Sequence, residues 1–454
     1  MKRASGVLLP LFSLPGEYGV GTLGAGARYF IDRIAEGGFS WWQILPFCPP
    51  DGYGSPYAGL SSFAASPVYI DPAEMCAAEL ITGAECEEAK RPEGRFVEGG
   101  LFDARLALCK KAAERLDRAA LDDFLDREPE VAAFCRLYAD RGGDFAAIAF
   151  SQYEFFREWD SLRTYARGRG ISIMGDMPIY VSADSYDLAM YPDAFLLDVE
   201  GRAARVAGVP PDYFSADGQV WGNPLYDYGA MQADGYRFLR DRIAFLTRRF
   251  DALRLDHFRG YHSYYSIPAG ACAREGAWEQ GPGDALFSAL SDLLADYPVV
   301  AEDLGDVGAE VDEFRRRCGF LSTRVLQVAF LGDPQSVHLP HNYPEDSVAY
   351  SGTHDNETLQ AYLFAMPKSE RGYLLDYCGT TGDDGVRAAI RTLLATHARL
   401  AILPLADLLS FGAPHRINTP GRAEGNWSVR FLHDELAALD TAQYLYLNRL
   451  FGRV

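Results

Sequence analysis

Basic residues are scarce in this sequence of 454 residues. It has 43 lysines and arginines against 63 aspartates and glutamates, which gives a formal net charge of −20 at pH 7. Nucleic acids and anionic membrane surfaces would be repelled by such a charge. We therefore expect no nucleic-acid or membrane partner, whereas a neutral substrate is compatible with the composition.

Paired cysteines and long apolar runs are also missing. None of the eight cysteines forms a C-x-x-C pair, which predicts neither a zinc knuckle nor a redox dithiol, and scattered thiols indicate a reducing compartment. No window approaches the roughly 18–20 consecutive apolar residues that cross a bilayer. The apolar stretch 7–14 is broken by Pro10 and is too short for a signal peptide. We expect a cytoplasmic protein.

Short apolar runs rich in β-branched residues alternate with longer helical patterns. This alternation is the signature of a parallel sheet, and eight such runs match a (β/α)₈ TIM barrel of the α/β class. The predicted strands span residues 6–12, 41–47, 171–181, 251–257, 298–302, 323–330, 347–352 and 400–405. The spacing of apolar residues predicts helices over 24–37, 236–249, 284–295 and 384–399.

The predicted strands are unevenly spaced. Roughly 120 residues separate the second from the third, far more than one crossover helix needs. The stretch 76–137 is rich in Ala, Glu, Lys and Leu and predicts a helical insertion, whereas 182–228 is dense in Pro, Gly, Asp and Tyr and predicts a long structured loop. We expect one barrel over 1–454 with inserted, largely helical subdomains at about 48–150 and about 182–230.

Four acidic residues stand at or just beyond the ends of predicted strands: Asp176, Asp256, Glu302 and Asp355. Barrel enzymes keep their catalytic groups at the carboxyl ends of the strands. A carboxylate that follows an apolar run is costly to bury unless it is paired or used. One such residue could equally end a strand or cap a helix, but four on separate strands favour a shared site.

Several carboxylates without a metal-binding motif suit glycosyl transfer. That reaction needs a proton donor for the leaving oxygen and a carboxylate that faces the developing oxocarbenium ion. The period of a strand puts Arg254 and Asp256 on the same side, where the guanidinium would keep Asp256 ionised as a nucleophile requires. Glu302 would need a raised pKa to hold a proton near neutrality. Position alone does not assign these two roles.

The stretches around these acids read GDMPIYV at 175–181, RLDHFRG at 254–260, AEDLG at 301–305 and GTHDN at 352–356. They resemble the four signature regions of amylomaltases, the 4-α-glucanotransferases of glycoside hydrolase family 77. The similarity covers nearly the whole chain, because further matching stretches lie near both ends: SGVLL at 5–9, SLPG at 13–16, WWQILP at 41–46, SPY at 55–57, NTPG at 418–421 and GNWS at 425–428.

The resemblance implies Asp256 as nucleophile, Glu302 as acid/base, and Asp355 as the residue that grips sugar hydroxyls and stabilises the transition state. It also implies substrate-binding residues, of which Arg254 and His354 line the subsite of the glucosyl intermediate, Asp176 supports it, Tyr57 stacks on the sugar, and Trp221 lies in a mobile loop over the acceptor side. Gln219 and Asn356 complete that set.

The implied reaction transfers a segment of an α-1,4-glucan or maltooligosaccharide to the 4-hydroxyl of another glucan, glucose or maltose. The implied mechanism is a retaining double displacement through a covalent glycosyl-Asp256 intermediate, with no cofactor. The chain departs from the family at 9–13, where LPLFS replaces the frequent LHPTS. Pro178 and Ile179 replace the Asn-His pair that helps to bind calcium in α-amylases, so no metal is implied. The length leaves no room for the β-sandwich that follows the barrel in amylases.

Two motifs suggest other chemistry. GVGTLG at 19–24 fits the dinucleotide fingerprint G-x-G-x-x-G, but it does not follow its strand directly, and 41–47 offers no acid for a ribose, so we interpret it as a βα-loop. His338 and His341 flank Pro340, which opposes a helix holding both rings toward one metal, and we expect an ordinary loop.

Two other functions remain open. A hydrolase could use the same residues, since hydrolysis differs only in the acceptor. A non-catalytic glucan-binding protein is the second alternative, and retention of Asp256, Glu302, Asp355 and Arg254 argues against it.

Overall fold

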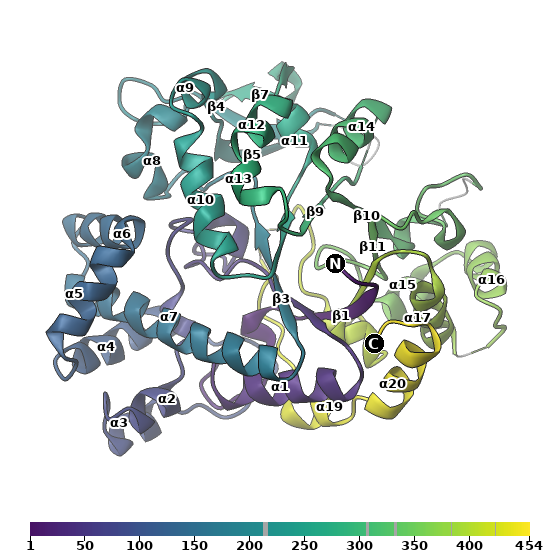
Figure 1. Ribbon diagram of the computed structural model, residues 1–454, viewed down its shortest axis with the longest axis horizontal. Coiled ribbons are helices and arrows are strands. Elements are labelled where there is room, and N and C mark those ends of the chain that lie inside the picture. The colour runs from purple at the N-terminus through teal and green to yellow at the C-terminus, as the bar shows by residue number, and fades with distance from the viewer. Residues whose placement is uncertain (212–216, 306–307, 331–333, 383, 423) are drawn as a thin grey trace.

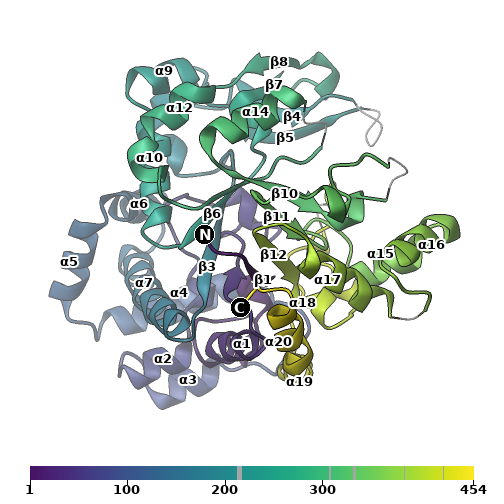
Figure 2. The same cartoon turned by 45° about the vertical axis from the view of Figure 1, so that its right-hand side comes forward.

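Eight parallel strands close into a barrel in chain order (Figures 1 and 2). The structure is a computed structural model that describes residues 1–211, 217–305, 308–330, 334–382, 384–422 and 424–454. The barrel strands are β1 Ala4–Leu8, β2 Trp41–Gln43, β3 Ser172–Met177, β6 Ala252–Leu255, β9 Val299–Ala301, β10 Leu321–Val325, β11 Ser347–Tyr350 and β12 Leu400–Pro404. Each overlaps one predicted run, so the predicted (β/α)₈ barrel is confirmed.

The apolar runs extend beyond the strands that they contain. The run 323–330, for example, leaves the sheet at Val325, and Leu326–Val328 forms a 3₁₀ turn. Leu326 and Phe330 nevertheless stay buried. An apolar run therefore indicates which residues are buried, and burial continues past the last hydrogen bond of the sheet. For this reason the predicted strands end too late in the chain.

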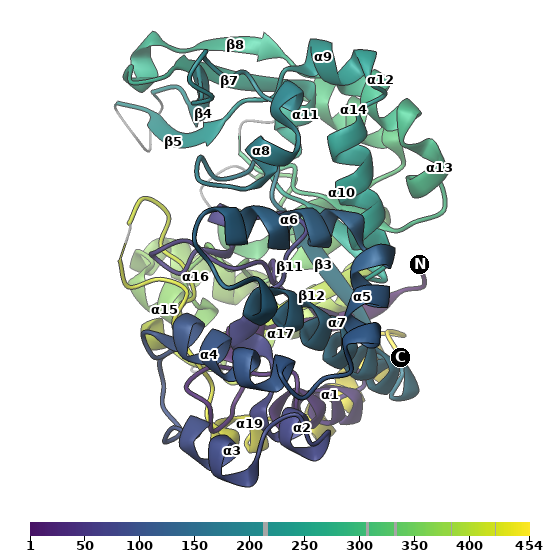
Figure 3. The same ribbon diagram turned by 90° about the vertical axis from the view of Figure 1, so that its left-hand side faces the viewer.

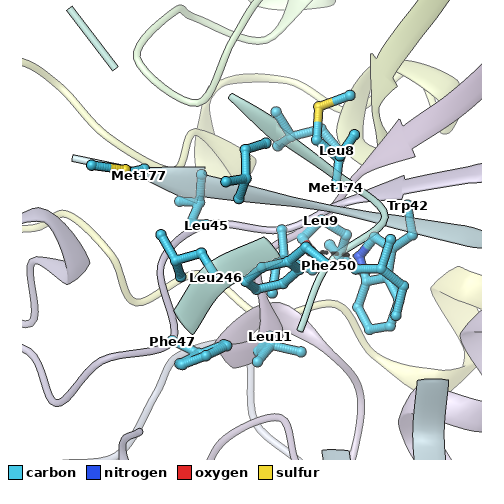
Figure 4. Close-up of a cluster of buried hydrophobic side chains, with 14 of the residues drawn as sticks. Leu8, Leu9, Leu11, Trp42, Leu45, Phe47, Met174, Met177, Leu246 and Phe250 are labelled. Carbon is cyan, nitrogen blue, oxygen red and sulfur yellow. Dashed lines mark hydrogen bonds between the residues drawn. The ribbon is translucent and has the colours of Figure 1, made fainter. Parts of the chain in front are cut away.

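Buried apolar side chains of the barrel strands and of the segments that follow them form the core, part of which is shown in Figure 4. Trp42 is fully buried and donates its indole N–H to the carbonyl of Leu9 at 2.8 Å. Phe250 stacks on Phe47 with ring centroids 5.5 Å apart. A methyl group at Gly175 would collide with the Phe250 ring, so the close approach of this ring to β3 requires glycine.

Helices fill the chain between β2 and β3 (Figure 3). They are α2 Pro72–Ala77, α3 Gly83–Ala89, α4 Leu101–Ala113, α5 Arg118–Arg127, α6 Pro129–Asp140 and α7 Phe145–Gly168. Side chains that accept backbone N–H groups start several of them, as Asp71 does for α2, Thr82 for α3 and Asp144 for α7. The segment predicted to be a helical insertion is helical for this reason.

An antiparallel sheet corrects the expectation of a long structured loop over 182–228. Its strand order is β5-β4-β7-β8, and its strands are β4 Arg205–Val209, β5 Gln219–Pro224, β7 Ser263–Pro268 and β8 Ala277–Gln280. The predicted loop supplies β4 and β5, whereas β7 and β8 follow β6, where the sequence analysis placed no insertion. Pairing between distant short strands leaves no local pattern to detect. Residues 212–216 of the predicted loop lie outside the described residues.

The remaining helices complete the fold. They are α1 Ala25–Glu36, α8 Asp187–Met190, α9 Tyr228–Ala233, α10 Arg237–Thr247, α11 Arg259–His262, α12 Gly283–Ala289, α13 Ser291–Leu294, α14 Ala309–Cys318, α15 Leu359–Ala365, α16 Lys368–Tyr377, α17 Gly385–Ala395, α18 Leu405–Leu408, α19 His433–Ala437 and α20 Thr441–Leu450. Three of the four predicted helices match single helices, and 284–295 is divided at Leu290 into α12 and α13.

The two ends of the chain meet beside the barrel (Figures 1 and 2). Arg453 donates from Nη1 to the carbonyl of Ala4 at 2.7 Å. In the described chain after β12 there are helices, loops and an isolated bridge between Val429 and Phe96, and no β-sandwich. Of the helices that the structure describes, not one has the length and apolarity needed to span a bilayer.

Candidate active site

The predicted site residues meet at the carboxyl ends of the barrel strands. Asp176 lies in β3 and Arg254 in β6, while Asp256, Glu302 and Asp355 follow β6, β9 and β11. Parallel strands of a barrel all end at one face, which brings these side chains together. Seven of the ten predicted site residues line one cleft of about 420 Å³: Tyr57, Gln219, Trp221, Asp256, Glu302, His354 and Asp355.

Arg254 is the centre of the charge network beneath this cleft. Its side chain is 3% exposed, and Nη1 lies 2.7 Å and 2.6 Å from the two carboxylate oxygens of Asp176. The same Nη1 lies 3.4 Å from Asp256 Oδ1, and Nη2 lies 2.8 Å from Glu302 Oε1. One planar guanidinium thus contacts three carboxylates and holds the two predicted catalytic groups beside each other.

The two predicted catalytic carboxyl groups differ in their environments. Burial raises the pKa of Asp256 well above its ordinary value, and the charge of Glu302 adds to this rise. Burial also acts to raise the pKa of Glu302, but the Arg254 guanidinium and the backbone N–H of His257 outweigh it and lower that pKa. The pKa values of the two groups therefore shift in opposite directions, upward for Asp256 and downward for Glu302, which is the reverse of what the sequence analysis expected of a nucleophile and an acid/base.

The turn after Asp256 aims a backbone N–H at Glu302. His257 has a φ of 43°, in the left-handed region, and its N–H donates to Glu302 Oε2 at 2.7 Å. Such a conformation costs roughly 1–3 kcal/mol for a residue with a side chain and persists where the surroundings impose it. The strained turn therefore links the position of Glu302 to the end of β6.

Asp355 also lines the cleft and is held by two residues. His354 Nε2 lies 3.3 Å from Asp355 Oδ1, and Asn418 Nδ2 donates to the same oxygen at 2.6 Å. The Asp355 side chain stays 37% exposed and faces the cleft. The sequence analysis gave Asn418 no role, and the one available signal was its place in the NTPG stretch.

Three aromatic rings form a wall beside these carboxylates. The Tyr57 ring stacks on the His354 ring with centroids 5.1 Å apart and an interplanar angle of 16°. Trp427 lies 5.7 Å from Tyr57 and 5.9 Å from His354. The Tyr57 hydroxyl donates to Asp176 Oδ2 at 2.8 Å, and burial raises the pKa of Tyr57, which keeps this hydroxyl protonated. Stacking of Tyr57 on a sugar stays a prediction.

Trp221 and Gln219 project from β5 onto the other side of the cleft. Trp221 is 38% exposed and donates its indole N–H to Gln219 Oε1 at 3.2 Å. Its ring meets the His257 ring edge-on at 5.0 Å. The antiparallel sheet therefore carries these two residues to the site, next to the turn that follows Asp256.

Asn356 is the predicted site residue that the structure places apart from the cleft. Its Oδ1 accepts hydrogen bonds from the backbone N–H and the hydroxyl of Thr353, at 2.8 Å and 3.0 Å. This contact closes the turn that presents His354 and Asp355. The side chain thus shapes its own loop.

The two motifs set aside from the sequence have structural roles. A methyl group at Gly21 would collide with the carbonyl of Leu11, and one at Gly24 with the carboxylate of Asp71, so close packing explains these glycines. His338 Nδ1 accepts the N–H of Val325 at 3.1 Å. Among the residues that the structure describes, no three His, Cys, Asp or Glu side chains are grouped to hold a metal ion.

A closed (β/α)₈ barrel whose strand ends present an arginine-linked set of carboxylates, lined by aromatic rings, defines a carbohydrate-active barrel enzyme. The family model described as 4-alpha-glucanotransferase, glycoside hydrolase family 77, matches residues 9–147 and 126–435. The chain therefore belongs to this family, whose activity is 4-α-glucan transfer. The expected family is confirmed.

Individual relatives agree with this assignment. The 4-alpha-glucanotransferase of Thermus thermophilus is 37% identical, with 96% of each chain covered. The chloroplastic/amyloplastic 4-alpha-glucanotransferase of Solanum tuberosum is 35% identical, with 94% of this chain and 82% of that protein covered. The structure of the amylomaltase from Streptococcus agalactiae in complex with acarbose superposes with a TM-score of 0.95 at 31% identity over the whole of both chains.

Proposed function

We propose that this protein transfers segments of α-1,4-glucans to the 4-hydroxyl of another glucan, glucose or maltose by a retaining double displacement. In the first half-reaction Glu302 donates a proton to the glycosidic oxygen while Asp256 attacks the anomeric carbon, which gives a glycosyl-Asp256 ester and a shortened glucan. In the second, Glu302 removes the proton of the acceptor 4-hydroxyl, whose oxygen displaces Asp256.

The observation that carries this proposal is the contact of one buried guanidinium with Asp176, Asp256 and Glu302. It brings the two carboxyl groups proposed as nucleophile and acid/base to one spot in the cleft. Asp355 lines the same cleft, where the reacting sugar would lie, and can bind its hydroxyls. The family relatives and the acarbose complex of the Streptococcus agalactiae amylomaltase support an α-glucan as the substrate.

The proposed roles require substrate to oppose the pKa shifts of the free site. Contact with Arg254 and with the His257 N–H lowers the pKa of Glu302, whereas the acid role requires a proton on Glu302. A sugar bound between the two carboxyl groups replaces water around them and strengthens the attraction of Arg254 for an ionised Asp256. Release of Glu302 from Arg254 on binding completes this change.

Incubation with maltotriose alone tests the proposal. Transfer yields glucose together with a ladder of longer maltooligosaccharides at a constant total of reducing ends. A steady rise in reducing ends would instead establish a hydrolase. The variant Asp256→Asn should lose turnover, with Asp292→Asn, at an exposed ion pair on α13, as the matched charge control. Full turnover by Asp256→Asn would overturn the assignment of the nucleophile.

A further inference from the structure

Asp407 is a buried carboxylate that no step of the proposed reaction uses. It lies in α18, directly after β12 (Figure 2), and only 1% of its surface is exposed. No ion pair to Asp407 is found in the part of the chain that the structure describes. Burial raises the pKa of this carboxyl to about 6, so the protein bears a cost for an acid at this position.

The two oxygens of Asp407 bind the two ends of one loop. Oδ2 accepts the hydroxyl of Ser351 at 2.5 Å, immediately after β11, and Oδ1 accepts the backbone N–H of Leu359 at 2.7 Å, the first residue of α15. Both partners are fully buried. The residues between these anchors include His354 and Asp355.

The outer part of this loop has other anchors. Gln327 donates to the carbonyl of Glu357 at 2.7 Å, and Arg416 donates to the carbonyl of Asp355 at 3.1 Å. Each of these contacts holds one point of the loop where it faces the cleft, whereas Asp407 joins its first and last residues. A displacement at the base would move the whole turn, including the carboxylate of Asp355.

We propose that Asp407 is a positioning residue that holds Asp355 and His354 in place by clamping both ends of the 351–359 loop. The inference rests on the proposed function, in which Asp355 stabilises the transition state. A group that stabilises a transition state must be placed within a fraction of an ångström, and a misplacement of about 1 Å costs on the order of 100-fold in rate. The clamp supplies that placement from beneath the barrel face.

The variant Asp407→Ala tests the proposal. It should lower kcat for maltotriose disproportionation by about 10–100-fold with little change in KM, because the loss falls on the transition state. Asp407→Asn should recover most of this loss, since its amide oxygen can accept from Leu359 while its amide nitrogen donates to Ser351. Asp71→Ala is the matched control, because Asp71 is a buried carboxylate that accepts from the Thr22 hydroxyl and from the backbone N–H of Ala73 in α2 and does not line the cleft.

A double-mutant cycle distinguishes positioning from general stabilisation. In an Asp355→Asn background, Asp407→Ala should lower the melting temperature but produce no further loss of kcat, measured with an α-maltosyl fluoride donor. The proposal is wrong if Asp407→Ala keeps the wild-type kcat while losing thermal stability as Asp71→Ala does. It is also wrong if Asp407→Ala lowers kcat in the Asp355→Asn background by the same factor as in the wild type.

If Asp407→Ala does not fold, Ser351→Ala takes its place as the test. This variant removes one arm of the clamp and should give a smaller loss of kcat. An unchanged kcat in a folded Ser351→Ala contradicts the clamp, and a wild-type protein without transfer activity overturns the proposed function itself.

Discussion

The two sides of the cleft are built in different ways. Following the proposed function, we call one side the donor wall, which consists of Asp176, Arg254, Tyr57, His354 and Asp355. The other side, which consists of Gln219 and Trp221, is the acceptor wall. Ion pairs and hydrogen bonds link residues of the donor wall to the strand ends of the barrel. The acceptor wall lies on β5 of the antiparallel sheet, and both of its residues are exposed.

This difference matches the demands of a transferase. Charge that develops at the anomeric carbon is best stabilised by groups that do not reorganise during the reaction, which a buried and cross-linked wall provides. An acceptor site must admit chains of different lengths and release them, which favours exposed rings that gain affinity by stacking. Substitutions in the donor wall should therefore affect the rate of the chemical step, and substitutions in the acceptor wall the fate of the intermediate.

Loss of the acid/base gives the largest expected effect. Glu302→Gln keeps the size of the side chain but cannot give up a proton, and kcat/KM for maltotriose should fall by about 10³-fold. With α-maltosyl fluoride the leaving group needs no protonation, so the burst of fluoride release should recover. A burst as slow as the maltotriose reaction would show that Glu302 is not the acid.

The second largest effect should follow a change in the centre of the donor wall. A lysine at position 254 places one compact ammonium where a planar guanidinium contacts Asp176, Asp256 and Glu302. Arg254→Lys should lower kcat/KM for maltotriose by about 10²-fold, because the two catalytic groups lose their shared orientation. Arg240→Lys, at the exposed pair with Asp292, is the matched control. Activity of Arg254→Lys within threefold of the control would mean that only the positive charge matters.

The donor wall could be largely predicted from the sequence, and the setting of the acceptor wall could not. Asp176, Arg254 and Asp256 stand at the ends of continuous apolar runs, because a strand of a parallel barrel is buried on both faces. The strand β5 gives no such run, since its first half is exposed, and it pairs with β4 across residues that carry no periodic signal. Trp221 was thus identified only through the family resemblance.

The two asparagines beside Asp355 show a second limit of the sequence. Asn356 is adjacent in the chain and was predicted to bind substrate, but its short side chain turns back onto Thr353. Asn418 reaches Asp355 from 63 residues away. Local sequence indicates which residues share a loop, whereas only the packing of β11 against the segment after β12 determines which amide meets the carboxylate.

An intermediate effect should separate hydrogen bonding from stacking in the donor wall. Tyr57→Phe keeps the ring against His354 but removes the hydroxyl that donates to Asp176. A hydrogen bond to a charged group contributes roughly 1.5–3 kcal/mol. Because Arg254 still pairs with Asp176 in the variant, most of this free energy should be kept, and kcat/KM should fall by about 10-fold. Thermal unfolding should show a modest loss of stability. A variant with wild-type kcat/KM would indicate that the ring alone carries the role of Tyr57.

The smallest effect on rate should come from the acceptor wall, and it should differ in kind. Trp221→Ala removes an exposed indole whose N–H donates to Gln219, also exposed, so neither thermal stability nor donor cleavage should change by much. Loss of a stacking surface worth roughly 1 kcal/mol should instead raise the KM for glucose as acceptor by about fivefold. Water then competes better for the glycosyl intermediate, and the fraction of turnover that yields new reducing ends should rise. Trp278→Ala is the matched control, because Trp278 is an exposed indole on β8 of the same sheet but does not line the cleft. If both variants divide the intermediate between sugar and water as the wild type does, the ring of Trp221 does not bind the acceptor. The two walls would then differ in structure but not in function.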